Sequence, residues 1–136
     1  MNTTSWLIVA LAFTAVLWMP YVLHRMVRIG IVRTLGNPSP QDDAEQAPWA
    51  LRARAAHANA VANIAHFAPI ALLAVHFGAA NDGTATSASA VFVAGRVVHY
   101  LAYAAGALGL RTVSFLVAFA AEGVLLSVAL RTAGAS

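Results

Sequence analysis

The segment "LRARAAHANAVANIAHFAPIALLAVHF", residues 51–77, decides the fold class of this 136-residue chain. It is long enough to cross a membrane as one helix, because about 20 mostly apolar residues span a hydrocarbon core of about 30 Å. Two arginines, three histidines and two asparagines interrupt its apolar residues. Polar side chains are costly inside a bilayer and face other helices or cavities, so their spacing indicates where this helix packs.

The composition of the whole chain is typical of a membrane protein. Hydrophobic residues make up 60% of the chain and charged residues only 10%, which is too apolar for a soluble domain of this size. The basic residues are all arginines scattered among apolar runs, so we expect no nucleic-acid partner. The absence of cysteine excludes disulfides, thiolate metal ligands and a cysteine nucleophile, and we expect no metal site.

Four segments are long and apolar enough to span the bilayer, at about residues 6–29, 49–79, 87–105 and 110–130. The first contains Pro20, which removes one backbone hydrogen bond and predicts a kink. We therefore expect an all-α fold, an integral membrane four-helix bundle, with residues 1–136 forming a single domain in the lipid bilayer.

The distribution of arginines predicts the orientation in the membrane. The long hydrophilic loop, residues 33–48, is flanked by arginines on both sides, whereas the turn "GAANDGTATS", residues 78–87, has no basic residue. The positive-inside rule then places the long loop in the cytoplasm and both chain ends outside. We expect an integral protein of a bacterial inner membrane or an equivalent one.

Helical spacing places polar side chains on one face of each of the last three spans. These faces consist of Arg52, Asn59, Asn63 and His66 in the second span, Arg96, His99, Tyr100 and Tyr103 in the third, and Arg111, Ser114, Ala118 and Glu122 in the fourth. Their cytoplasmic halves lie at similar depth, so we expect one cavity that opens to the cytoplasm. Its expected lining is Arg54, Asn59, His99, Tyr103 and Arg111. Since no acid is expected nearby, this cavity would take an anionic guest.

Structural roles compete with functional ones for these polar groups. Asparagine and histidine on membrane helices often only form hydrogen bonds between helices, and this reading is favoured for His57, His66 and His76 taken singly. Arg96 and Glu122 lie at matched depth on adjacent spans, and a mutual ion pair is favoured over separate functional roles.

Two stretches, "RARAAHANAVANIAHFAPI" at residues 52–70 and "RVVHYLAYAAGALGLRTVSF" at residues 96–115, resemble the signature regions of the MAPEG family. This family comprises the membrane-associated proteins in eicosanoid and glutathione metabolism. The resemblance covers nearly the whole chain and implies a four-helix protomer of MAPEG type that assembles as a homotrimer. It further implies glutathione bound between protomers at the cytosolic side, and transferase or peroxidase activity on lipophilic small molecules.

The resemblance also implies roles for individual residues. Arg111 resembles the arginine that holds the glutathione sulfur as a thiolate, and with Tyr103 and His99 it forms the expected catalytic set. The expected glutathione-binding set is Arg54, Asn59, Arg96 and Thr112. Asn59 resembles the family's glutathione-contacting asparagine, Arg96 belongs to the third-span motif, and Thr112 stands where a serine or similar residue follows the arginine.

Two positions depart from the family pattern. Ala55 replaces an arginine and Ala62 replaces a glutamate. Glutathione carries two carboxylates, an ammonium group and a thiol, so these replacements remove one carboxylate partner and the acid that meets the ammonium group. An alternative therefore stays open, in which the chain is a non-catalytic membrane protein that binds an anionic lipid or amphiphile. A small multidrug transporter is disfavoured, because residues 1–41 contain no acid.

Overall fold

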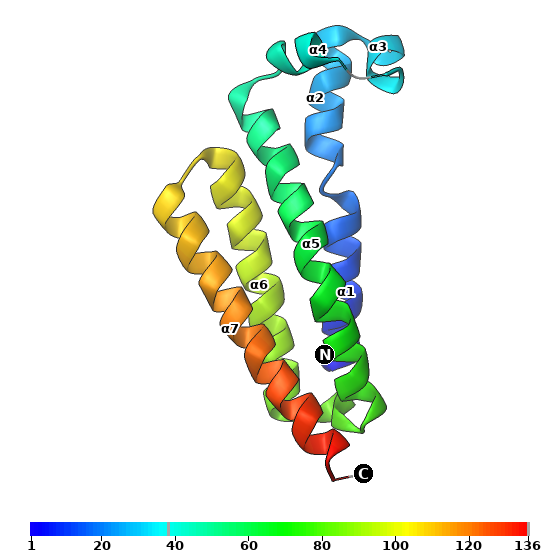
Figure 1. The fold of residues 1–136 in the computed structure, drawn as a ribbon, viewed down its shortest axis with the longest axis vertical. Helices are drawn as coiled ribbons and strands as arrows, with labels where there is room; N and C mark the ends of the chain where they lie inside the picture. The colour runs from blue at the N-terminus through cyan, green and yellow to red at the C-terminus, as the bar shows by residue number, and fades with distance from the viewer. Residues whose placement is uncertain (38, 136) are drawn as a thin grey trace.

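The computed structural model describes residues 1–37 and 39–135. All regular structure in these residues is helical (Figure 1). The helices are α1 (Thr3–Val16), α2 (Met19–Ile29), α3 (Ile31–Leu35), α4 (Pro40–Ala44), α5 (Pro48–His76), α6 (Gly83–Ala105) and α7 (Leu108–Ala133), with a short 3₁₀ helix, η1 (Ala79–Asn81).

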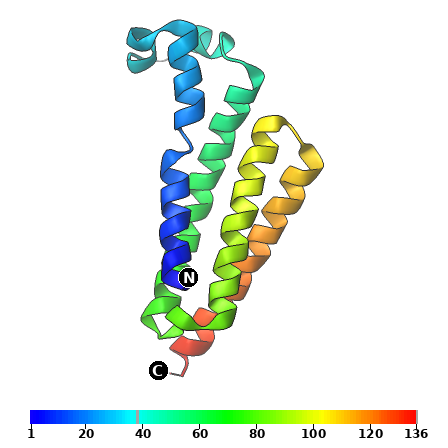
Figure 2. The same ribbon diagram turned by 180° about the vertical axis from the view of Figure 1, so that it is seen from behind.

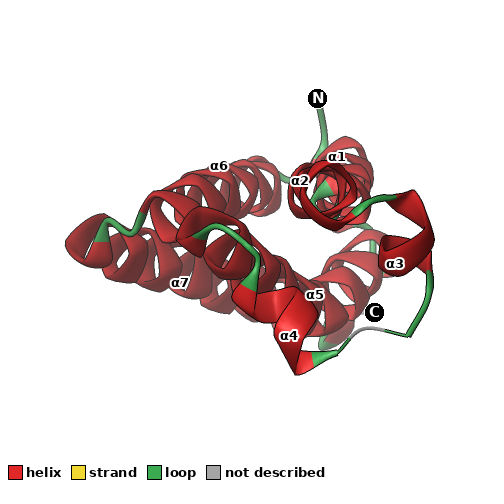
Figure 3. Cartoon of the chain, turned by 90° about the horizontal axis from the view of Figure 1, so that it is seen from above, coloured by secondary structure: helices red, strands yellow, loops and turns green. Residues whose placement is uncertain are grey.

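Four helical segments are long and apolar enough to cross a membrane, which is the architecture expected of an integral membrane protein. They are α1 with α2 as one unit, Thr3–Ile29, followed by α5, α6 and α7. The start of α1 and the end of α7 lie toward the end of the bundle opposite α3 and α4 (Figures 1 and 2). Seen from above, α6 and α7 run beside each other and α1 stands apart from α7 (Figure 3).

Capping residues explain why two helices begin earlier than their apolar runs. The Asn2 side chain accepts a hydrogen bond from the Ser5 amide at 3.0 Å, and the Asp82 side chain accepts one from the Ala85 amide at 2.8 Å. Each bond satisfies an amide that has no partner in the first turn of a helix. The helices α1 and α6 therefore begin at the cap and not at the first apolar residue.

The predicted kink in the first span is confirmed. The helix breaks at Leu17 and Trp18, and Pro20 lies in the first turn of α2, where its missing N–H costs nothing. The Tyr100 hydroxyl donates a hydrogen bond of 3.1 Å to the Leu17 carbonyl. This bond fastens the break to α6.

The long loop contains two short helices that the sequence analysis did not anticipate. At the start of α4, the backbone amide and the hydroxyl of Ser39 both donate hydrogen bonds of 2.8 Å to Asp42. The Arg33 Nη2 also donates a hydrogen bond of 2.6 Å to the Asp42 Oδ1. Together these bonds hold the pKa of the Asp42 carboxyl below its usual range. The ionised Asp42 therefore stabilises the loop at pH values above the ordinary pKa of an aspartate. This stabilisation is lost as the pH falls through the lowered pKa of Asp42 in the folded protein.

The bundle core is built from small residues and stacked aromatic rings. Phe67 of α5 and Phe92 of α6 stack with ring centroids 3.8 Å apart, and both are fully buried. Between α6 and α7, the backbone of Gly95 lies close against Ala118 and Ser114. Such close packing through small residues is how membrane helices associate without a hydrophobic driving force.

The contact at Gly95 gives a test of this packing. A methyl group added there would lie 3.0 Å from the Ala118 Cβ and 3.1 Å from the Ser114 carbonyl oxygen. We expect Gly95→Ala to lower the free energy of unfolding by about 1 to 3 kcal/mol, because α6 and α7 must separate. The matched control is Gly123→Ala on α7, since no atom of the described residues lies within 4 Å of the added group. Denaturant titration in detergent would contradict the packing if the two variants unfold alike.

Candidate functional site

The polar faces of α5 and α6 meet at Asn59 and Arg96. The Arg96 Nη2 donates a hydrogen bond of 2.6 Å to the Asn59 Oδ1, and the Asn63 side chain donates one of 2.7 Å to the Asn59 carbonyl. Arg96 is buried and only 5% exposed. Its Nε and Nη1 have no hydrogen-bond partner among the described residues. The guanidinium therefore keeps unused donors inside the bundle.

The predicted ion pair between Arg96 and Glu122 is wrong. Among the described residues, Glu122 of α7 pairs instead with the His66 ring of α5, and the partner of Arg96 is Asn59. The physical reason is that α5 packs against both α6 and α7 and offers each buried group a partner of its own. Matched depth placed Arg96 and Glu122 at one level but did not determine which helix each side chain faces.

The three expected catalytic residues lie together at the turn between α6 and α7. The Arg111 guanidinium lies over the Tyr103 ring, 4.6 Å from its centroid. The His99 and Tyr103 rings meet edge to face, with their centroids 5.7 Å apart. Gly106 ends α6 with a φ of 82°, in the left-handed region that favours glycine. The tight turn brings the first turn of α7, with Arg111, back over the end of α6.

The hydrogen bond of His99 fixes the arrangement of its ring. The His99 Nδ1 lies 2.9 Å from the Arg111 carbonyl oxygen. Because a carbonyl can only accept, Nδ1 carries the hydrogen, and in the neutral ring Nε2 has the free lone pair. This Nε2 is buried and has no partner within residues 1–37 and 39–135. The ring is thus held with one unused acceptor atom beside Tyr103.

Two of the expected glutathione-binding residues lie apart from this group. Arg54 projects from α5 toward α4, where its Nη1 donates hydrogen bonds of 2.9 and 3.0 Å to the two Asp43 oxygens. Thr112 is exposed, and its hydroxyl donates to the Leu108 carbonyl of its own helix at 3.2 Å. In one chain, therefore, neither residue joins the group at the α6–α7 turn.

Arg52 has a structural partner that sequence reasoning missed. Its Nε donates a hydrogen bond of 3.0 Å to the Ala104 carbonyl, near the end of α6. Its guanidinium also lies against Gly106, where an added Cβ would approach it to 3.4 Å. Arg52 thus ties the start of α5 to the α6–α7 turn. The only sequence signal for this role was its place on the polar face of α5.

The positions that depart from the family pattern lie on the outer surface of this chain. Ala55 and Ala62 are both exposed, and the His66 side chain one turn further along α5 is 51% exposed. A group that contacts this face must come from outside the chain. Among the described residues, no three histidine, aspartate or glutamate side chains are placed to hold a metal ion.

Comparison with known proteins identifies one match. The family model of MAPEG matches residues 8–131, which include the second and third spans, nearly all of the first and fourth, and every site residue described above. Neither a curated protein nor a solved structure matches the chain.

Proposed function

This chain belongs to the MAPEG family, and from that premise we propose that it is a membrane enzyme that uses glutathione on lipophilic small molecules. Proteins of this family commonly bind glutathione. The observation that carries the proposal is the grouping of Arg111, Tyr103 and His99 at the α6–α7 turn. This grouping combines a cation, a phenol and an imidazole with a free acceptor atom.

Each of these residues has a chemical role in thiol transfer. Arg111 provides the positive charge that favours a thiolate over a thiol. His99 is placed to accept the thiol proton at Nε2, since Nδ1 is held by the Arg111 carbonyl. Tyr103 can donate a hydrogen bond to the thiolate or to the leaving group. Glutathione supplies the nucleophilic sulfur, and a transferase reaction expels a leaving group such as halide from the electrophile.

The unused donors of the bundle fit an anionic peptide, but only in part. Arg96 retains two buried nitrogens that have no hydrogen-bond partner in residues 1–37 and 39–135, and Asn59 already contacts its third nitrogen. Nothing on the exposed face of α5 at Ala55 or Ala62 can meet a carboxylate or an ammonium group. Loss of two charge-assisted hydrogen bonds weakens binding by about two to four orders of magnitude. We therefore propose a functional but weakened glutathione site.

Assembly as a homotrimer is part of this proposal. His66 is half exposed although its helix is long and apolar enough to span the membrane, and exposure of an imidazole to lipid is unfavourable. A neighbouring copy that covers this face would shield the His66–Glu122 pair. It could also bring Arg54 or Thr112 of one chain toward the catalytic group of another, which a single chain does not do.

The membrane orientation is a further part of the proposal and has its own test. The arginines at both ends of the long loop favour a cytoplasmic position for that loop, in a protein of a bacterial inner membrane or an equivalent one. We expect a reporter enzyme fused to the C-terminus to be active only on the external face. Activity of the fused reporter in the cytoplasm would reverse the orientation and move the α6–α7 turn to the outer side.

A second candidate function is binding of an anionic lipid or amphiphile without catalysis. The separation of Arg54 from the catalytic group favours it, because this arginine already holds a carboxylate at the end of the bundle. A measurement of turnover distinguishes the glutathione-dependent enzyme from the non-catalytic binding protein. Purified protein with glutathione and a halonitroarene should release halide in proportion to enzyme concentration. If no turnover is detected in intact trimeric protein, the enzyme proposal fails and the binding function remains.

A further inference from the structure

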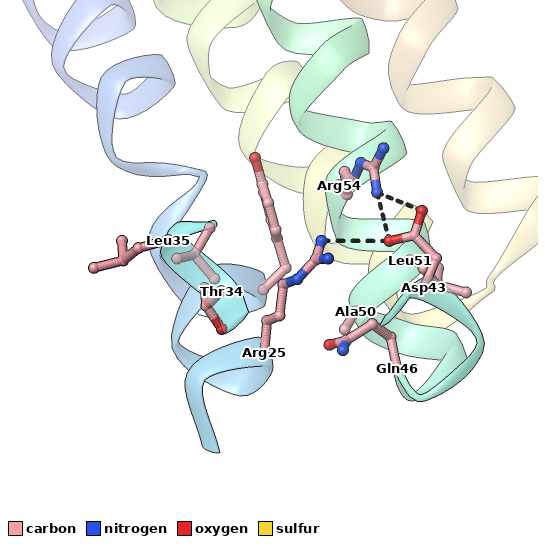
Figure 4. Close-up of a pocket in the computed structure, with 10 residues that line it drawn as sticks. Arg25, Thr34, Leu35, Asp43, Gln46, Ala50, Leu51 and Arg54 are labelled. Atoms are coloured by element: carbon pink, nitrogen blue, oxygen red, sulfur yellow. Dashed lines mark hydrogen bonds and ion pairs between the residues drawn. The ribbon is translucent and has the colours of Figure 1, made fainter. Parts of the chain in front are cut away.

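A cavity of about 280 Å³ lies at the end of the bundle that carries the long loop. It is bounded by α2, α3, α4 and α5 (Figure 4). Its charged lining consists of Arg25, Arg54 and Asp43, and Val22, Leu35 and Leu51 form apolar walls. Apolar walls with a few converging polar groups are typical of a small-molecule site, and this volume is near the lower end of the usual range.

One carboxylate holds both arginines of the cavity. The Asp43 Oδ1 accepts hydrogen bonds from Arg54 at 2.9 Å and from Arg25 at 3.4 Å, and its Oδ2 accepts a second from Arg54 at 3.0 Å (Figure 4). The arginines belong to long helices that span the membrane, whereas Asp43 belongs to the five-residue helix α4. The rigid elements thus supply the cations and a short surface helix supplies the anion.

Asp43 does not use all the donors that the cavity offers. The Nε and Nη2 of Arg25 are buried and have no hydrogen-bond partner among the described residues, and its side chain is only 13% exposed. The Arg25 Nη2 forms a long ion pair of 3.6 Å with the Asp42 Oδ2, but this carboxylate takes its hydrogen bonds from Ser39 and Arg33. A carboxylate free to move deeper could reach donors that Asp43 leaves unpaired.

The mouth of the cavity is apolar on the α3 side. Leu35 lines the cavity and is 72% exposed, and Ile31 and Val32 of the same helix are 61% and 87% exposed. This short helix follows directly on the first span, so its exposed apolar side chains lie where the hydrocarbon region meets the headgroups. An apolar tail bound at the arginines would have a path along α3 into the lipid.

We propose that Arg25 and Arg54 form a binding site for the carboxylate of a single-chain amphiphile, and that Asp43 is an internal ligand that this carboxylate displaces. The three hydrogen bonds to Asp43 show the geometry in which a carboxylate fits. The site does not require glutathione, although Arg54 also belongs to the proposed glutathione-binding set. Loss of the internal ligand should therefore strengthen binding of the external one.

The test compares Asp43→Asn with Glu45→Gln. Glu45 follows the same helix, and its ion pair among the described residues is with Arg33. Both variants remove one negative charge, but only the first removes the carboxylate that Arg54 and Arg25 share, while Arg25 keeps its 3.6 Å ion pair with Asp42. With the full chain in nanodiscs of neutral lipid and labelled dodecanoate as the probe, we expect Asp43→Asn to lower the dissociation constant by about tenfold or more. Glu45→Gln should leave it unchanged, and Asp43→Glu should restore weak binding.

A second variant and other probes identify the chemical class of the ligand. Adding Arg25→Gln to Asp43→Asn should abolish the gain in dodecanoate affinity. Turnover of a halonitroarene with glutathione is measured separately and reports on the α6–α7 site. Equal affinity in Asp43→Asn and Glu45→Gln, or a gain that survives Arg25→Gln, would overturn the proposal. If inorganic phosphate or phosphatidylglycerol vesicles gain affinity and dodecanoate does not, the carboxylate assignment is overturned. Elution of each variant at the parent's position in size-exclusion chromatography checks that it is folded.

Discussion

Replacement of Arg111 with alanine should lower the rate of glutathione conjugation by about two to three orders of magnitude. The Arg111 guanidinium lies directly over the Tyr103 ring, which is in edge contact with His99, whereas the Arg96 guanidinium lies deeper, over Phe115. Loss of the Arg111 guanidinium raises the free energy of the thiolate and of the transition state that follows. The effect should appear in kcat and in the near-ultraviolet thiolate absorbance, while part of the glutathione binding remains, because other residues meet its carboxylates.

The matched control is Arg131→Ala, which removes the same charge from the exposed far end of the same helix. This variant should conjugate at the parent rate. Tyr103→Phe should give an intermediate loss, because the ring beneath the guanidinium is kept and only the hydroxyl is removed. If Arg111→Ala retains full thiolate absorbance and turnover, another cation holds the sulfur and the proposed role of Arg111 is wrong.

The double replacement Ala55→Arg and Ala62→Glu should strengthen glutathione binding at least about a hundredfold. Each new side chain would supply one charge-assisted hydrogen bond, worth about 1.5 to 3 kcal/mol, to a carboxylate or to the ammonium group. Both positions are exposed on α5, so the larger side chains enter without displacing the core of this chain. Calorimetric titration with glutathione measures the change.

The single variants serve as controls for the double replacement. Each should give part of the gain, and the two free energies should add to within about 0.5 kcal/mol if the new groups meet different parts of the ligand. A further Arg111→Ala substitution should remove the thiolate absorbance and leave part of the gained affinity. No gain in a folded double variant that elutes at the parent's position in size-exclusion chromatography would mean that this face of α5 does not contact glutathione.

Much of the fold follows from features that the sequence displays directly. Long apolar runs identify spans because a bilayer admits only segments with internally satisfied backbone groups, and Pro20 marks the break because its ring lacks an N–H. The short helices α3 and α4 were missed because prolines and acids in this segment suggested an irregular loop. The spacing of Ser39 and Asp42 is a helix-start signal that was available in the sequence.

The candidate site was accessible to sequence reasoning only in part. Helical period identifies which side chains share a face, and it placed Asn59 and Arg96 on the polar faces of their helices without predicting that the two would form a hydrogen bond. It does not specify how α5 is rotated about its own axis relative to α6 and α7, and this rotation decides which side chains meet. For that reason Glu122 was assigned to Arg96 and not to His66. Similarly, the contact of Arg54 with Asp43 depends on how α4 folds back over α5.

Calorimetric titration of the purified protein with glutathione tests the central claim most directly. The account predicts saturable binding with a dissociation constant of about millimolar or tighter, because Arg111 and the buried donors of Arg96 remain although two family partners are missing. Arg111→Ala should weaken this binding, and Arg131→Ala should not. Absence of saturable binding in folded protein, with the site occupied instead by a co-purified anionic lipid, would contradict the claim that this chain uses glutathione.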